Sequence, residues 1–335
     1  MAKTFRLPKE EPLLNIASYA RGGPRAADRL TPSQIEQIRL TVNRAPEAVV
    51  KVLPRSSNDL KAVGKHLDYI GRRGNLELQG DDGERLQGRV ADGLLEDWDL
   101  DIDDARRQGS LAAASRRTPP KLVHKLMFSM PPGTPPQKVL SAVRNFAREE
   151  FHGQHRYAMV LHTDEPHPHV HLVLKAVSEQ GVRLNIKKAT LRHWRSQFAS
   201  HLRGLGVAAN ATERAVRGES RSARKDGIYR ANLRGDSSFM RARVDAVARE
   251  LANGGTRTEP GKQSILETRA DVLQGWRSVA DRLARSGQPE LASDVAKFAD
   301  AMGQPRTSKE QLTRELVLAG HARQQDARAI AKAVR

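Results

Sequence analysis

The chain has 335 residues and a formal net charge of +18, because 57 lysines and arginines outnumber 39 aspartates and glutamates. This excess indicates a polyanionic partner, and nucleic acid is the leading candidate. The lack of cysteine excludes disulfides, thiolate nucleophiles and cysteine-type zinc sites. With no bilayer-length apolar run and no secretory leader after Met1, we expect a cytoplasmic protein that does not insert into a membrane.

The N-terminal part predicts a basic arm and then a helix. Residues 1–30 carry arginines among glycine and proline and have no sustained period. Thr31 suits the N-cap and Pro32 the first position of a helix that ends near Arg44. Residues 47–54 then predict a strand, which the final proline ends.

Residues 58–72 predict an amphipathic helix with Tyr69 turned away from the core. Its apolar stripe consists of Leu60, Val63, Leu67 and Ile70. Tyr69 lies off this stripe, with Lys65, His66 and Arg73 within one turn of it. These basic neighbours favour a phenolate and would also hold a phosphate.

The middle of the chain predicts alternating strands and helices. In order these elements are a hairpin turning at residues 81–83, a solvated acidic helix at 92–104, a linker at 105–120, a strand at 121–130, a helix at 135–151, a hairpin at 156–175 and a helix from Lys188 to about Leu205. The order strand, helix, strand, strand places the hairpin in the same sheet as the strand at 121–130.

The hairpin at 156–175 contains four histidines within ten positions. Because side chains alternate along a strand, His169 and His171 share one face of their strand, and His162 falls on the matching face of the preceding one. Three neutral imidazoles on one face predict a divalent-metal site with open coordination positions. Asp164 could orient a ligand imidazole or act as a base, and both roles remain open at this point.

Three stretches carry a resemblance to one family. Residues 65–78 contain Tyr69, residues 128–134 contain Ser129, and residues 162–171 contain the histidines. They resemble the three motifs of the conjugative relaxases, or mobilisation nucleases, of the HUH endonuclease superfamily, and most closely the Ti-plasmid (MOBP-like) type. The resemblance covers roughly residues 48–219. It departs from the family at Lys175, where asparagine is common, which leaves the role of that position open.

The resemblance implies an α+β fold, with a central antiparallel sheet of about five strands, helices packed on one face, and a helical C-terminal extension. It implies that Tyr69 attacks DNA, that Ser129 contacts substrate near the scissile phosphate, and that His162, His169 and His171 hold Mg²⁺ or Mn²⁺. Five basic residues are assigned to DNA or phosphate contacts: Lys65, His66, Arg72, Arg73 and His167.

The implied function is site- and strand-specific nicking and closing of single-stranded DNA at a transfer origin, through a tyrosine-5′-phosphate intermediate. Expected partners are that DNA, accessory relaxosome proteins and a type IV secretion coupling protein, and export with DNA into a recipient cell stays open. Three rivals remain: an HUH replication initiator, whose tyrosine usually follows the histidines, a three-histidine zinc hydrolase using metal-bound water, and a non-catalytic DNA-binding accessory protein.

Three parts are expected along the chain: residues 1–45 as basic arm and helix, 46–220 as the relaxase domain, and 221–335 as an Arg-rich extension. The last part predicts four or five helices, such as 265–286 and 308–319. Its sequence suggests neither a catalytic motif nor a compact core, and we expect a role in recruitment to the transfer machinery or in extra DNA contact.

Overall fold

A computed structural model describes residues 30–53, 59–105, 120–220, 226–255 and 257–333. Most of the predicted N-terminal arm and of the predicted linker at 105–120 lies outside these residues. By contacts the chain divides into two compact units, of which the first contains Glu36–Ala211 and the second Thr212–Arg335. Each unit is described by itself.

The first unit is built on an antiparallel sheet of six strands among the residues described, in the order β1-β4-β6-β5-β2-β3. The strands are β1 (Val49–Val52), β2 (Leu78–Gly80), β3 (Arg85–Leu86), β4 (Val123–Ser129), β5 (Tyr157–His162) and β6 (His169–Lys175). The predicted α+β class and antiparallel sheet are confirmed. The two predicted hairpins form β2–β3 and β5–β6, and β1 and β4 complete the sheet.

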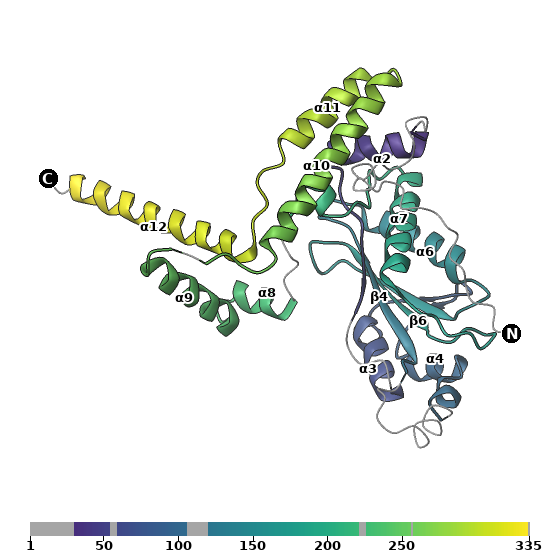
Figure 1. Cartoon of the computed structure of the whole chain (residues 1–335). Coiled ribbons are helices and arrows are strands. Elements are labelled where there is room, and N and C mark those ends of the chain that lie inside the picture. The colour runs from purple at the N-terminus through teal and green to yellow at the C-terminus, as the bar shows by residue number, and fades with distance from the viewer. Residues whose placement is uncertain (1–29, 54–58, 106–119, 221–225, 256, 334–335) are drawn as a thin grey trace. The chain divides into compact units, whose positions relative to one another are not determined.

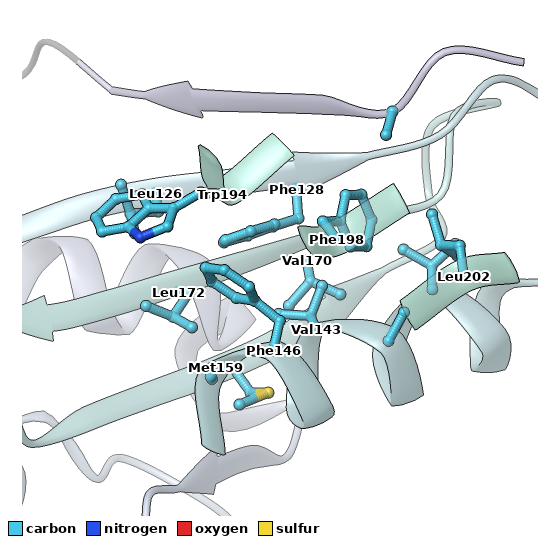
Figure 2. Packing of buried hydrophobic residues seen from close by; sticks show 14 of the residues in the cluster. Leu126, Phe128, Val143, Phe146, Met159, Val170, Leu172, Trp194, Phe198 and Leu202 are labelled. Carbon is cyan, nitrogen blue, oxygen red and sulfur yellow. The ribbon is translucent and has the colours of Figure 1, made fainter. Parts of the chain in front are cut away.

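One face of the sheet is covered by α6 (Pro136–Phe151) and α7 (Lys188–Gly204), as Figure 1 shows. Figure 2 shows the aromatic centre of this core, where Phe128 of β4 packs against Phe146 and Phe198 at 5.0 and 5.3 Å between ring centroids. Alternation along β6 sends Val170, Leu172 and Leu174 into the same core. The apolar stripe of α7 enters it through Trp194, Phe198 and Leu202.

The opposite face carries α3 (Leu60–Ile70) and α4 (Ala91–Asp97), so the sheet has helices on both faces and not on one (Figure 1). The reason is the stripe of α3, which packs Val63, Leu67 and Ile70 on this face and leaves Tyr69 outside. The expectation of a solvated helix around Trp98 is wrong, since Trp98 is 1% exposed and joins this second core.

The predicted N-cap of the first described helix is confirmed, and a second helix has a cap of the same kind. Thr31 caps α2 (Pro32–Val42), because its Oγ1 accepts from the backbone N–H of Gln34 at 3.2 Å. Asp59 caps α3 in the same way, accepting from the N–H of Ala62 at 2.8 Å. Such caps fix where the chain enters each helix.

The second unit is helical and, contrary to expectation, has a core of its own. Its elements are a short 3₁₀ turn η2 (Ala215–Arg217) and five helices within the described ranges, α8 (Asp226–Leu233), α9 (Ser238–Ala252), α10 (Lys262–Arg285), α11 (Pro289–Asp300) and α12 (Ser308–Ala333). Trp276 of α10 is fully buried against Phe298 of α11 and donates to the carbonyl of Val216 at 2.8 Å. Within the described residues no helix is both long and apolar enough to span a bilayer.

Candidate active site

Three histidines come together on the α3 face of the sheet. His162 ends β5 and pairs across strands with His169, which begins β6, while His171 pairs with Val160. Ring centroids lie 5.1 Å apart for His162 and His169, 4.7 Å for His162 and His171, and 5.2 Å for His169 and His171. One nitrogen from each ring lies within 4.8 Å of the other two. The three side chains selected by strand parity therefore form one cluster.

Two backbone carbonyls orient these rings. The carbonyl oxygen of Ile70 lies 2.7 Å from Nε2 of His162, and that of His167 lies 3.0 Å from Nδ1 of His169. A carbonyl only accepts, so these nitrogens donate, and Nδ1 of His162 and Nε2 of His169 are the acceptors. Nδ1 of His162 lies 3.3 Å from the donor Nη2 of Arg72, so an ion bound there would replace this hydrogen bond. Nδ1 of His171 is buried and has no hydrogen-bond partner in the described part of the chain. The donor set fits a divalent ion held by three imidazoles.

Burial keeps two of the three rings neutral. Desolvation, reinforced by His162 and His169, lowers the pKa of His171 to about 3. Desolvation also lowers the pKa of His162, although its hydrogen bond to Ile70 opposes this shift. Both rings are therefore uncharged near pH 7, which is the state in which an imidazole binds a metal.

Tyr69 lies at the C-terminal end of α3, one aromatic ring away from the cluster. Tyr69 is 57% exposed, although the neighbouring Ile70 is fully buried. The His66 ring stacks with Tyr69 at 6.3 Å between centroids and meets His171 edge-on at 6.2 Å. The phenol is thus accessible from solvent and connected to the cluster through His66.

Arg72 joins the tyrosine to the histidines. Its guanidinium carbon lies 5.2 Å from the centroid of the Tyr69 ring, and Nη2 lies 3.3 Å from Nδ1 of His162. The same nitrogen pairs with the carboxylate of Asp164. Arg72 and Arg73 both have positive φ, 52° and 57°, in the 3₁₀ turn η1 (Arg72–Gly74) that follows α3. Non-glycine residues in this conformation are strained, and such strain gathers at functional sites.

Asp164 pairs with the guanidinium of Arg72 and not with an imidazole. Burial opposes the shift, but the hydrogen bond and the charge of Arg72 lower the pKa of Asp164 below its ordinary value. The hydrogen bond from Nε2 of His162 is accepted by the carbonyl of Ile70 and not by Asp164. Sequence analysis missed this contact, because a backbone carbonyl leaves no residue-type signal and the two residues are 92 positions apart.

Ser129 lies beside the cluster and Lys175 lies away from it. Ser129 ends β4 directly across from His169, so Ser129, His169 and His162 form one row on three adjacent strands. Lys175 is four residues beyond His171, about 13 Å along β6. Its ammonium lies 3.6 Å from the carboxylate of Glu179.

The remaining basic candidates surround the site at the surface. Lys65 on α3, Arg73 in η1 and His167 in the turn before β6 are exposed. His167 supplies its carbonyl to the cluster through the hydrogen bond to His169, while its imidazole is at the surface. The structure thus brings Tyr69, His66, Arg72 and Asp164 together with the three histidines.

Sequence comparison agrees with this arrangement. Residues 82–202 match the family model described as the relaxase nuclease domain of the MobA/VirD2-like type. This span includes Ser129 and the three clustered histidines, and Tyr69 lies before it. The predicted resemblance is confirmed: residues 82–202 are similar to the nuclease domain of MobA/VirD2-like relaxases.

Two curated relatives show which relaxases the chain is similar to. The T-DNA border endonuclease VirD2 of Rhizobium radiobacter is 24% identical over 207 residues, which are 51% of this chain and 43% of that protein. The T-DNA border endonuclease VirD2 of Rhizobium rhizogenes is 23% identical over 205 residues, 51% of this chain and 42% of the relative. The match therefore spans less than half the length of either relative.

Proposed function

We propose that this chain cuts single-stranded DNA at a transfer origin and stays joined to the 5′ end through Tyr69. The observation that carries the proposal is the convergence of an exposed tyrosine, a paired arginine and three clustered imidazoles near the end of α3. A metal-bound water would need no tyrosine there. Both relatives are T-DNA border endonucleases, which supports the same chemistry.

The reaction is a transesterification at phosphorus. Tyr69 gives up its phenol proton to solvent, and its oxygen forms a bond to the scissile phosphorus while the bond from phosphorus to the 3′ oxygen breaks. The departing oxygen takes up a proton and becomes a free 3′-hydroxyl. The new phosphotyrosine ester retains the energy of the broken bond, so attack by a 3′-hydroxyl reverses the step and closes the strand.

His162, His169 and His171 would hold the divalent ion, Mg²⁺ or Mn²⁺ in this proposal. When bound, the ion polarises a phosphate oxygen and offsets the negative charge that develops during displacement. Ile70 and His167 hold two of the three rings through their carbonyls, so the ligand nitrogens are aimed before the ion arrives.

Arg72 is placed to meet the scissile phosphate. Its guanidinium already lies between the tyrosine ring and the cluster, and it can exchange the Asp164 carboxylate for a phosphate oxygen. Asp164 then restrains the guanidinium between turnovers. Ser129 contributes a hydroxyl beside His169, while Lys65, His66, Arg73 and His167 contact the flanking backbone.

The wider role is a proposal on the same basis. The nicked strand would be piloted through conjugative transfer, with relaxosome proteins and a type IV coupling protein as partners and export with the DNA as one consequence. We propose residues 46–220 as the relaxase domain, preceded by the basic arm and followed by the extension that serves recruitment.

The test uses labelled single-stranded oligonucleotides from the origin region of the mobile element that carries the gene. Incubated with Mg²⁺ or Mn²⁺, the wild type should release a 5′-side fragment with a free 3′-hydroxyl. The 3′-side fragment should migrate with the protein under denaturing conditions, and mass spectrometry should place it on Tyr69. Tyr69→Phe should lose the adduct, keep DNA affinity, and change the free energy of unfolding by at most about 0.5 kcal/mol.

Other outcomes assign the chemistry differently. An adduct on Tyr157 or on another tyrosine would move the nucleophile. Metal-dependent cleavage without any adduct would make the chain a hydrolase that uses metal-bound water. DNA binding without cleavage would leave an accessory protein.

A further inference from the structure

A second basic site lies on the sheet face opposite the histidine cluster. A cleft of about 690 Å³ opens where β1 and β4 meet the start of α7. Its cations are Lys121, Arg183, Lys187 and Lys188. Aliphatic side chains, among them Val52, Ile186 and Leu191, form the rest of its wall. The described lining contains no carboxylate, so the cleft presents positive charge beside an apolar surface.

The cleft is separate from the site around Tyr69. Strand alternation puts His124 on the face of Leu126 and Phe128, which pack under α6 and α7, and the histidine cluster is on the other face. His124 also lies five residues before Ser129, about 17 Å away along β4. No step proposed for the nicking reaction involves these residues.

His124 is a buried polar side chain in the wall of the cleft. It is only 9% exposed and lines the cleft. Its Nε2 lies 3.2 Å from the carbonyl oxygen of Leu184, so this nitrogen carries the proton. Its Nδ1 is then an acceptor, and it is buried with no hydrogen-bond partner among the residues described. Burial lowers the pKa of His124 to about 4, which keeps this acceptor unprotonated.

The start of α7 adds an anion-binding element. α7 has 17 residues, no acidic residue in its first turn, and Lys187 and Lys188 at its entrance. The first backbone N–H groups of a helix lack intrahelical backbone acceptors, which suits a phosphate. In α7 the N–H of Lys187 already donates to Oγ1 of Thr190 at 3.2 Å, so the N–H groups that follow it are the ones a phosphate would meet. Arg183 is held at the rim by a hydrogen bond from Nη1 to the carbonyl of Lys121 at 2.7 Å.

We propose that this cleft binds a nucleotide of the same DNA strand that is cut at Tyr69. A nucleotide combines the two features that the cleft calls for: a phosphate for the cations and an apolar base face for the aliphatic wall. The proposal rests on the proposed function, because it takes single-stranded DNA as the substrate.

The edge of the sheet offers the strand a path between the two faces. β1 is an edge strand. Lys51 is exposed, and its register with Met127 and His171 puts it on the histidine face. Val52, the next residue, lines the cleft on the other face. A single strand that leaves the histidine cluster past Lys51 therefore reaches the cleft by rounding β1.

The experiment compares oligonucleotides of two lengths on the full chain. A short oligonucleotide spans the nick only, and two longer ones extend it by ten thymidines on the 5′ or the 3′ side. For the wild type, the extension on one of the two sides should give tighter binding than the short oligonucleotide, as measured by fluorescence anisotropy. Arg183→Gln/Lys187→Gln should lose this gain, by roughly tenfold or more. Its slope of log K against log salt on that oligonucleotide should become shallower by about 1.4, for two phosphate contacts.

The matched control is Lys138→Gln/Arg148→Gln, which removes the same charge from exposed positions of α6 in the same unit. It should retain the gain from extension. A 5-iodouracil placed in the tightening extension should crosslink, on irradiation, to the peptide that contains residues 183–191. Equal affinity of wild type for all lengths, an equal loss in the control, or crosslinks confined to other peptides would overturn the proposal.

Two further arms separate the causes of failure. If the wild type neither binds nor nicks the short oligonucleotide, the proposed function is refuted. If it nicks normally but gains no affinity from either extension, only the proposal for the cleft is refuted. Thymidine monophosphate is the probe for a free nucleotide. If it displaced the extension at micromolar concentration, the cleft would serve a free nucleotide and the strand assignment would be wrong.

Discussion

Adding Mn²⁺ should stabilise the first unit, because the three imidazoles are brought together only in the folded chain. A ligand at 100 times its dissociation constant that binds only the folded state adds about 2.7 kcal/mol. For a unit the size of Glu36–Ala211, 1 kcal/mol shifts the melting temperature by about 2–4 °C. The first unit should therefore melt roughly 5–11 °C higher with saturating Mn²⁺.

Two neighbouring histidines make the test specific. His169→Ala removes a ring whose Nδ1 is oriented by the carbonyl of His167, and should abolish the shift. His167→Ala removes an exposed imidazole and leaves that carbonyl in place, so it should keep the shift. Calorimetry with MnCl₂ and with EDTA measures both. A full shift in His169→Ala, or its loss in His167→Ala, would refute the assignment of ligands.

Three further predictions concern stability. Asp59→Ala removes the N-cap of the helix that carries Tyr69 and should cost about 1 kcal/mol in urea unfolding, whereas a neutral change would mean the cap contributes nothing. Trp276→Ala should cost the second unit about 3–5 kcal/mol, and a loss below about 1 kcal/mol would argue against the core described there. Burial lowers the pKa of His124 from 6.5 to about 4, so between these values the unfolded chain binds the proton and stability falls as pH falls. His124→Leu should flatten that dependence by up to about 1.4 kcal/mol per pH unit, and an unchanged slope would contradict it.

The strands and their faces were predictable because they depend on local alternation. One face of β6 carries Val170, Leu172 and Leu174, and the other His169 and His171, so a period of two was sufficient to sort core from site. The same reasoning turned Tyr69 away from the core, since a helix stripe fixes phase. Trp98 escaped prediction because the surrounding acidic residues dominate the local pattern, although a single indole can be buried by residues far away in sequence.

The contacts that complete the site could not be predicted, because they join distant segments through groups that carry no sequence signal. His162 is oriented by a backbone carbonyl, which every residue has, and only the tertiary fold selects Ile70. Arg72 takes its place through a positive φ that sequence preference disfavours in arginine.

These two contacts couple the parts of the proposed reaction. Ile70, whose carbonyl orients the His162 ring, is the residue next to Tyr69, so any shift of the end of α3 moves the proposed nucleophile and a proposed metal ligand together. Arg72 follows two residues later and contacts His162, Asp164 and the Tyr69 ring at once. One short segment, the last turn of α3 together with η1, thus determines the positions of Tyr69, of Arg72 and of the His162 ring. Precise placement of this kind is what in-line displacement at phosphorus requires, because there is little else for the protein to supply.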